Sequence, residues 1–294
     1  MSQYETLGLD AERYMGFDFE HYDKTLLPKL PPEDEIKWYS KFYYRGRREL
    51  GWDKLKYVAR GNTMDPAKAV LPGEYDKMLE PGLIQGDLGY CLLPDGTGYG
   101  STHSILDDVS FEMYSWYKTL RMIDKLSYMI WYPGSHVTEV NGVSIEDVGF
   151  GNERVDVVSP ATVKGLGFSC NPREKDPDFL GLIGGNTWFV NENNPAIKPR
   201  AMCLVHYIRK HSDEAIEFRT HIYMGTFLVD GKGEIMQRLS PELSLEAVRR
   251  MAEHCTYERE NVSTFLPELY EKMKDIDLSS AEAINECWPI DKNA

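Results

Sequence analysis

Two residues with metal-binding side chains, His254 and Glu258, lie four positions apart in a predicted C-terminal helix. Residues at this spacing project from the same face of an α-helix. Both fall within an apolar stripe, which consists of Ala247, Met251, Cys255, Val262, Phe265, Leu266 and Leu269. A carboxylate on an apolar face is costly to bury unless it is paired or metal-bound, and imidazole and carboxylate are both zinc ligands. The pair therefore suits a metal site, although a His–Glu hydrogen bond that only holds the helix in place explains the same spacing.

Further ligands must come from elsewhere in the chain, which contains seven histidines. His136 follows the turn WYPGS, and loops often position functional groups, although an ordinary loop histidine fits as well. Glu146 lies in an expected strand, VSIEDVG, whose alternation fits a solvent-facing or a cavity-facing strand. His206 and Tyr223 lie in neighbouring strand patterns that would allow them to face one cavity, although tyrosine-rich strands are more often simple sheet packing.

The elements that would position these residues follow a mixed pattern. Residues 1–100 are rich in Pro, Gly, Tyr and Asp and are expected to form loops, short helices and irregular strands. Apolar residues at helical spacing predict one amphipathic helix over residues 108–128. Residues 137–230 alternate like an antiparallel sheet, with strands expected in GVSIEDVG, RVDVVS, TWFVN, AMCLVHYIR and IEFRTHIYMGTFLV.

The last of these strands places two sets of side chains on opposite faces. One face is expected to carry Phe218, Thr220, Ile222 and Met224, and the other Arg219, His221 and Tyr223. Ser240-Pro241 and Ser244 then open a long helix over about residues 244–274. A curved antiparallel sheet followed by a long C-terminal helix predicts an α+β fold of the helix-grip type, with a cavity between sheet and helix.

Composition excludes several classes of function. The chain of 294 residues has a formal net charge of −14, which disfavours nucleic acid and anionic membranes as partners. No run of 18 apolar residues and no basic-then-apolar leader is present, so we expect no membrane span and no secretory signal. Five scattered cysteines without a CxxC motif are typical of a reducing compartment. A cytoplasmic protein is therefore expected.

Several blocks of the sequence resemble the diacetylphloroglucinol hydrolase and phloretin hydrolase family. The block MYSWYKTLRMIDKLSYMIWYPGSH, from Met113 to His136, is similar to the family's aromatic helix, which leads into a Tyr, a Trp-x-Pro turn and a metal-binding His. The resemblance continues through IEDVG, DVVSPATVKGLGF and LVHYIR and ends in HCTYERENVSTFLPELY. These blocks cover about residues 110–272, in the order that the family has them.

The resemblance implies a helix-grip protein of the pollen-allergen and START type that binds one zinc ion (Zn2+) per chain. By position, the ligands would be two histidines and two glutamates, namely His136, Glu146, His254 and Glu258. Residues that contact the phenolic oxygens of the substrate would be Tyr128, His206 and Tyr223. Residues 1–107 would form an irregular and helical region packed on the core, and residues 108–294 the helix-grip catalytic domain.

The implied activity is hydrolysis of the carbon–carbon bond between an acyl group and a polyhydroxylated aromatic ring, as in phloretin or an acylphloroglucinol. The partner would be this small phenolic ketone, and a homodimer is a possible assembly. Two alternatives remain open. One is a zinc enzyme on the same scaffold that acts on another ketone or an ester. The other is a non-catalytic helix-grip protein that binds a hydrophobic ligand, because fold alone does not determine function.

The chain departs from the family pattern at three places near the expected site. The loop between His136 and Glu146 is shorter, so Glu139 or Asp147 is an alternative fourth ligand. Ser135 stands where the family has Asp, and Trp116-Tyr117 replaces a Trp-His pair. These changes bear on the choice of substrate more than on the reaction.

Overall fold

The protein is built around a six-stranded antiparallel sheet with strand order β1-β2-β8-β7-β6-β5. The computed structural model describes residues 22–278 with gaps at Pro81, 137–138, 141–142, 145–153, 157–167 and 190–199. The strands of the sheet are β1 (Gly89–Leu92), β2 (Gly98–Leu106), β5 (Arg154–Asp156), β6 (Phe179–Phe189), β7 (Arg200–Lys210) and β8 (Ile216–Met224). Two small hairpins join β9 (Thr226–Val229) to β10 (Lys232–Ile235) and β3 (Glu139–Val140) to β4 (Val143–Ser144).

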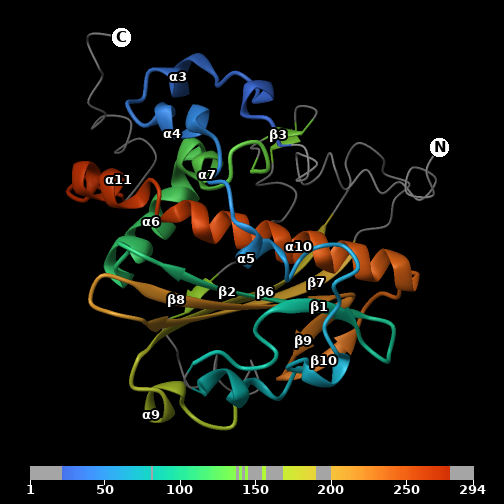
Figure 1. The fold of residues 1–294 in the computed structure, drawn as a ribbon. Coiled ribbons are helices and arrows are strands. Elements are labelled where there is room, and N and C mark those ends of the chain that lie inside the picture. The colour runs from blue at the N-terminus through green and yellow to red at the C-terminus, as the bar shows by residue number, and fades with distance from the viewer. Residues whose placement is uncertain are drawn as a thin grey trace, which may run out of the picture.

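A long helix, α10 (Pro241–Val262), lies across one face of the sheet over β1, β2 and β8 (Figure 1). On the same side are α6 (Phe111–Ile123), α7 (Lys125–Trp131) and α11 (Leu266–Met273), which packs on α6. The opposite side carries α9 (Pro172–Lys175) and the 3-10 helix η4 (Tyr75–Leu79). The remaining short helices are η2 (Lys24–Leu26), α3 (Pro32–Glu35), α4 (Ser40–Arg45), α5 (Trp52–Leu55) and η3 (Pro66–Lys68). The fold is thus of the α+β class.

Close packing between α10 and the sheet depends on two glycines of β2. A Cβ at Gly100 would lie 2.8 Å from Cγ2 of Val248, and one at Gly98 would lie 2.9 Å from the carbonyl oxygen of Ser244. A side chain at either position would push the helix away from the sheet. The helix can therefore bring its inner residues close to the sheet surface.

The predicted faces of β8 are confirmed. Ile222 and Met224 pack with Val248 of α10, and Phe218 packs in the cluster formed with α6 and α7. Tyr223 instead belongs to a cluster on the other face. Every residue of β8 is buried, because both faces of this central strand are covered.

The single helix predicted over residues 108–128 is wrong at Asp124, where the chain breaks into α6 and α7. Asp124 has extended backbone angles (φ −119°, ψ 115°) and caps α7, its side chain accepting a hydrogen bond from the backbone N–H of Ser127 at 2.7 Å. Lys37 and Tyr39 also donate to this carboxylate. An aspartate that caps the next helix is more stable here than inside a continuous one.

The helix predicted over residues 244–274 is likewise two helices, α10 and α11. It begins earlier, at Pro241, where Ser240 caps it by accepting from the N–H of Leu243. It ends at Val262 because Pro267 has no N–H to donate and its ring would clash with the carbonyl of Ser263. The chain resumes as α11 with Pro267 in its first turn, a position that tolerates proline.

The sheet also extends beyond the residues predicted for it. β1 and β2 lie within the region that was expected to be irregular, so the sheet crosses the proposed boundary between residues 107 and 108. The strand predicted over residues 216–229 is divided at Gly225, which has φ +88°. A Cβ there would lie 2.6 Å from the carbonyl oxygen of Gln237, so this turn requires glycine.

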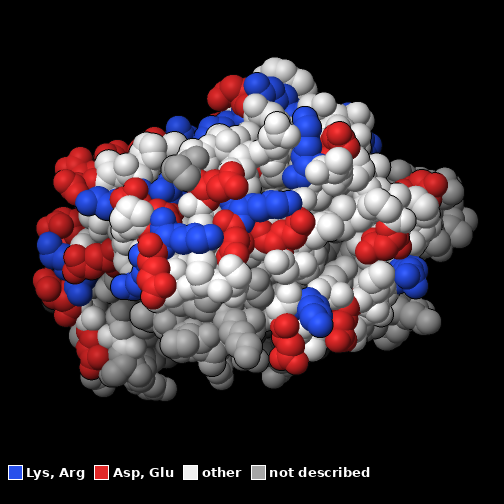
Figure 2. Space-filling view, turned by 90° about the horizontal axis from the view of Figure 1, so that it is seen from below, with Lys and Arg blue, Asp and Glu red and all other residues white. Residues whose placement is uncertain are grey.

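Charged side chains of both signs are interspersed on the face seen in Figure 2. Among the described residues, no helix combines the length and the apolar character needed to cross a membrane.

Candidate metal centre

Three of the predicted ligands come together where α7 meets α10. His136 lies at the end of the turn after α7, and His254 and Glu258 are one turn apart on α10. The Nε2 atoms of the two histidines are 3.2 Å apart. Oε2 of Glu258 lies 3.5 Å from Nε2 of His136 and 3.4 Å from Nε2 of His254. All three side chains are buried, and their donor atoms form a nearly equilateral triangle.

The triangle fits a metal ion. Ligand atoms at 2.0–2.1 Å from a tetrahedral zinc ion are about 3.3–3.4 Å from one another, close to the three separations observed. Two imidazole nitrogens and one carboxylate oxygen are also a donor set that zinc and several other divalent ions accept. The geometry of these three residues is therefore compatible with three corners of a tetrahedral metal site.

His136 is oriented by the helix that precedes it. Its Nδ1 lies 3.2 Å from the backbone carbonyl oxygen of Tyr128, which can only accept, so Nδ1 carries the proton and Nε2 offers a lone pair. The imidazole stacks on the Tyr128 ring at 4.4 Å with an interplanar angle of 8°, and Trp131 contacts it edge-on at 4.8 Å. Burial lowers the pKa of His136 to about 4, so the ring is neutral and able to bind a cation at neutral pH.

His254 is oriented by Ser135, which stands where the resemblance described above predicts an aspartate. Its Nδ1 lies 3.1 Å from Oγ of Ser135, and its ring packs 4.9 Å from that of Tyr132. A hydrogen bond at Nδ1 leaves Nε2 free to face His136, which is how the outer partner of a metal-binding histidine acts. The departure at residue 135 thus bears on the histidine of α10, which is distant in sequence.

Glu258 is ionised in spite of its burial. Burial alone would raise the pKa of this carboxyl group, but the positive charge of Arg259 and the two imidazoles that face the carboxylate outweigh burial and hold the pKa well below its usual range. Nη2 of Arg259 lies 3.3 Å from Oε1 of Glu258, the oxygen that does not face the histidines. The carboxylate therefore presents its other oxygen, Oε2, to the centre of the triangle.

His206 lies on the α10 side of the sheet and reaches the centre through Arg259. It is directly opposite Thr220 in β8, and its Nδ1 is 2.8 Å from Oγ1 of that residue. Nη2 of Arg259 lies 3.3 Å from Nε2 and 3.4 Å from Nδ1 of His206. Arg259 thus stands between Glu258 and His206.

Tyr223 lies on the other face of the sheet, so the expectation that it shares a cavity with His206 is wrong. Its hydroxyl donates to the carbonyl oxygen of Val70 at 2.7 Å, and its ring packs against Tyr75 and Tyr99. Neighbouring strands share a face according to their register, and His206 pairs with Thr220, whose side chain alternates with that of Tyr223. Burial raises the pKa of Tyr223, consistent with a neutral hydroxyl in the core.

The Tyr223→Phe variant is expected to lose stability but to keep its metal content and its turnover. Removing the hydroxyl leaves the buried carbonyl of Val70 without this donor, which costs about 1–3 kcal/mol in the free energy of unfolding. Tyr128→Phe is the matched change beside His136, and we expect it to lower turnover without changing metal content. Urea unfolding, metal analysis and turnover of both variants test this. A large loss of turnover in Tyr223→Phe at unchanged stability would contradict it.

The fourth predicted ligand lies outside the described residues. Glu146 and its alternative Asp147 fall in the gap at 145–153. Glu139, the other alternative, begins the short strand β3, whose backbone pairs with β4.

A comparison with protein families identifies the chain. The DAPG hydrolase PhiG domain matches it over residues 71–143 and 138–271, which is more than half of its length. The chain belongs to the DAPG hydrolase family. No curated protein sequence matches it. The family is one of hydrolases, DAPG being diacetylphloroglucinol, so the protein is an enzyme of this class.

The match to DAPG hydrolases spans β1 and β2 as well as the three clustered residues His136, His254 and Glu258. It includes Arg259, a contact of Glu258 that the sequence reasoning missed. The only signal in the sequence was a basic residue next to a proposed ligand, which does not distinguish a buried partner from an exposed side chain. The contribution of Ser135 to His254 was also missed, because the two residues lie 119 positions apart.

Proposed function

We propose that this DAPG hydrolase family member is a metal-dependent hydrolase that cleaves the carbon–carbon bond between an acyl group and a polyhydroxylated aromatic ring. The triangle formed by His136, His254 and Glu258 is the observation that carries the proposal. Zinc is the ion that we propose, one per chain, and the packing of α10 across the sheet supports a helix-grip scaffold around it.

Cleavage of such a bond needs help from the ring. A carbanion on an aromatic ring is a poor leaving group, but ortho and para hydroxyls let the ring accept a proton on carbon and become a vinylogous diketone. The oxygen of water then adds to the acyl carbon, and the carbon–carbon bond breaks. The electrons of the broken bond are delocalised over the oxygens of the ring. The products are a carboxylic acid and the deacylated phenol.

A bound divalent ion would supply a Lewis acid for the acyl carbonyl and for water. The residues of the chain would supply position and proton transfer. Tyr128 would hold a phenolic oxygen near the ligands, a role supported by the stacking of its ring on His136. His206 is placed to hold or move a proton, because its ring is fixed by Thr220 and Arg259.

The balance of charges around the proposed metal ion supports a fourth ligand that is anionic. Glu258 and Arg259 cancel each other, so the two positive charges of a metal ion need a further negative group nearby. The resemblance to the family makes Glu146 the first candidate for that position. We propose it as the ligand, with Glu139 and Asp147 as the alternatives.

We expect Glu146→Gln to abolish activity and Glu139→Gln to leave most of it. An amide keeps the size of the side chain and removes the negative charge, so the two variants differ only in which carboxylate is lost. Metal content and turnover of both purified proteins would be measured. The opposite pattern would move the ligand from residue 146 to residue 139.

The proposed function is tested by incubating the purified protein with phloretin and with diacetylphloroglucinol. Release of the carboxylic acid and the deacylated phenol, together with about one metal ion per chain, is the expected result. Protein that holds stoichiometric metal and releases neither product would overturn the proposed reaction.

A further inference from the structure

Arg259 is a fully buried cation beside the proposed metal centre. Its side chain is 1% exposed, on the inner side of α10. Moving a guanidinium out of water costs several kcal/mol unless its partners compensate. A second cation near a metal ion adds repulsion to that cost. Packing alone therefore does not explain why a cation is buried at this position.

The contact with Glu258 gives the first part of that reason. Nη2 of Arg259 lies 3.3 Å from Oε1 of Glu258, whereas Oε2 faces both histidines at 3.4 and 3.5 Å. A carboxylate that is free to rotate can present either oxygen or both to an ion. With Oε1 directed at the arginine, one oxygen remains for the triangle.

The guanidinium itself is held on its other sides. Nη1 donates to the hydroxyl of Tyr114 in α6 at 2.7 Å, and Nη2 also lies 3.3 Å from Nε2 of His206 in β7. The rings of Phe218 and Trp131 lie 4.7 and 5.0 Å from its central carbon. These partners come from α6, α7, β7 and β8, so the orientation of Arg259 is set by the tertiary structure. Only the planar guanidinium of an arginine, with its several N–H donors, can contact all of these partners at once.

We propose that Arg259 is a positioning residue of the metal centre, which holds Oε1 of Glu258 so that Oε2 alone is presented to the metal. This inference rests on the proposed metal site and does not depend on which substrate is cleaved. Loss of an outer partner of a metal ligand typically lowers metal affinity 10- to 100-fold. The same loss is expected when the guanidinium is removed.

The experiment compares zinc affinity in three variants with that of the wild type. Arg259→Met removes the charge and the donors at similar length, and Arg259→Lys keeps the charge but not the fork. The control is Arg209→Met, which removes another buried arginine. Arg209 pairs with Asp176 at 2.9 and 3.0 Å and with Glu217 at 3.3 Å, and it contacts none of the three ligands. Affinity would be measured by competition with a chromophoric chelator at a temperature where circular dichroism shows each variant folded.

We expect Arg259→Met to bind zinc about 10- to 100-fold more weakly, Arg259→Lys to lose less, and Arg209→Met to match the wild type. Wild-type affinity in both folded Arg259 variants would overturn the inference, as would an equal loss in Arg209→Met. If Arg259→Met does not fold, the zinc affinity of Arg259→Lys is compared with that of Arg209→Lys. Weaker zinc binding in Arg259→Lys alone supports the inference, and equal affinities overturn it. A wild-type protein that binds no zinc would instead refute the metal site of the proposed function, and a zinc protein without activity on acylphenols would refute its reaction.

Discussion

Replacing His254 by alanine is expected to remove both the bound metal and the activity while the protein remains folded. The side chain contributes one corner of a triangle whose sides are 3.2, 3.4 and 3.5 Å, and its loss opens the coordination sphere. Loss of a direct ligand has a larger effect than loss of an outer partner, which itself costs 10- to 100-fold. Loss of metal and activity is also expected when the carboxylate of Glu258 is removed. Metal analysis of the purified variants and assays of turnover test both.

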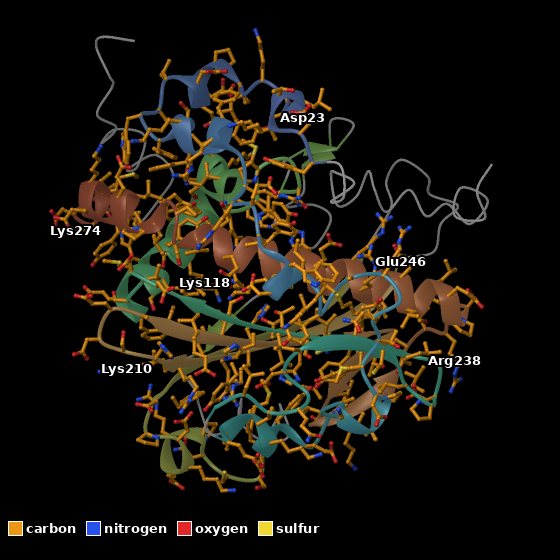
Figure 3. All side chains as sticks on the ribbon, viewed as in Figure 1. Asp23, Lys118, Lys210, Arg238, Glu246 and Lys274 are labelled. Carbon is orange, nitrogen blue, oxygen red and sulfur yellow. The ribbon has the colours of Figure 1, made fainter. Side chains whose placement is uncertain are left out.

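The choice of substitution matters at Glu258 because of its neighbour. Alanine would leave the buried guanidinium of Arg259 without its carboxylate, which can destabilise the fold by about 3–5 kcal/mol. Glu258→Gln also removes the negative charge, but it retains the shape and an oxygen that can accept from Arg259, so it is expected to disturb folding less than alanine does. Glu246→Gln is the control. Glu246 pairs with Arg249 and Arg250 near the N-terminal end of α10 (Figure 3). Full metal occupancy in His254→Ala and Glu258→Gln would disprove the assignment of these ligands.

An acylated phloroglucinol is expected to be cleaved, and the matching acyl benzene without ring hydroxyls is not. The first reason is chemical, because only a hydroxylated ring can accept a proton on carbon and share the resulting charge. The second is recognition, since a site that binds hydroxyl groups through buried polar atoms rejects an analogue without them by roughly 10⁴- to 10⁵-fold. Tyr128, placed beside His136, is the side chain proposed to make such a contact.

Initial rates on the two ketones and on a simple aryl ester test this prediction. Comparable rates on the two ketones would disprove the mechanism by ring protonation. Activity on the ester alone would point to a different hydrolase on the same metal centre, because ester hydrolysis needs no protonatable ring. Metal content would be unaffected in either case, so the ligand assignment is tested separately, by the metal content of the His254 and Glu258 variants.

One part of the candidate site could be read from the sequence more directly than the elements around it. The spacing of His254 and Glu258 within an apolar stripe is a local property of one helix, and such properties can be read without a structure. Contact with His136, which lies 118 positions from His254, depended on the family resemblance. The alternation within β8 was also local and is confirmed. The register between β7 and β8 is not a local property and could not be read from the sequence. For this reason Tyr223 was assigned to the wrong side of the sheet.

Some of the remaining errors had visible signals. Asp95-Gly96 between apolar segments is a hairpin signature, and β1 and β2 form that hairpin, with Gly96 at φ +85°. Asp124 and Pro267 both mark helix starts inside patterns that were interpreted as continuous helices. The partner of β2 had no such signal, because long-range strand pairing leaves little trace in a single sequence.

The pairing of β2 with β8 has a consequence for how the chain folds. Tyr99 and His221 meet across 122 positions, and the segment between them contains α6, α7 and His136. Folds dominated by such distant contacts form slowly, because a large loop must close before the contacts contribute. At a synthesis rate of 5–20 residues per second, β2 waits roughly 6–25 s for β8 to be made. During that time one edge of the hairpin is unpaired, and an unpaired edge is where chains associate. His254 and Glu258 lie on α10, which is synthesised after β8, so the cluster that they form with His136 cannot assemble before β8 has been made.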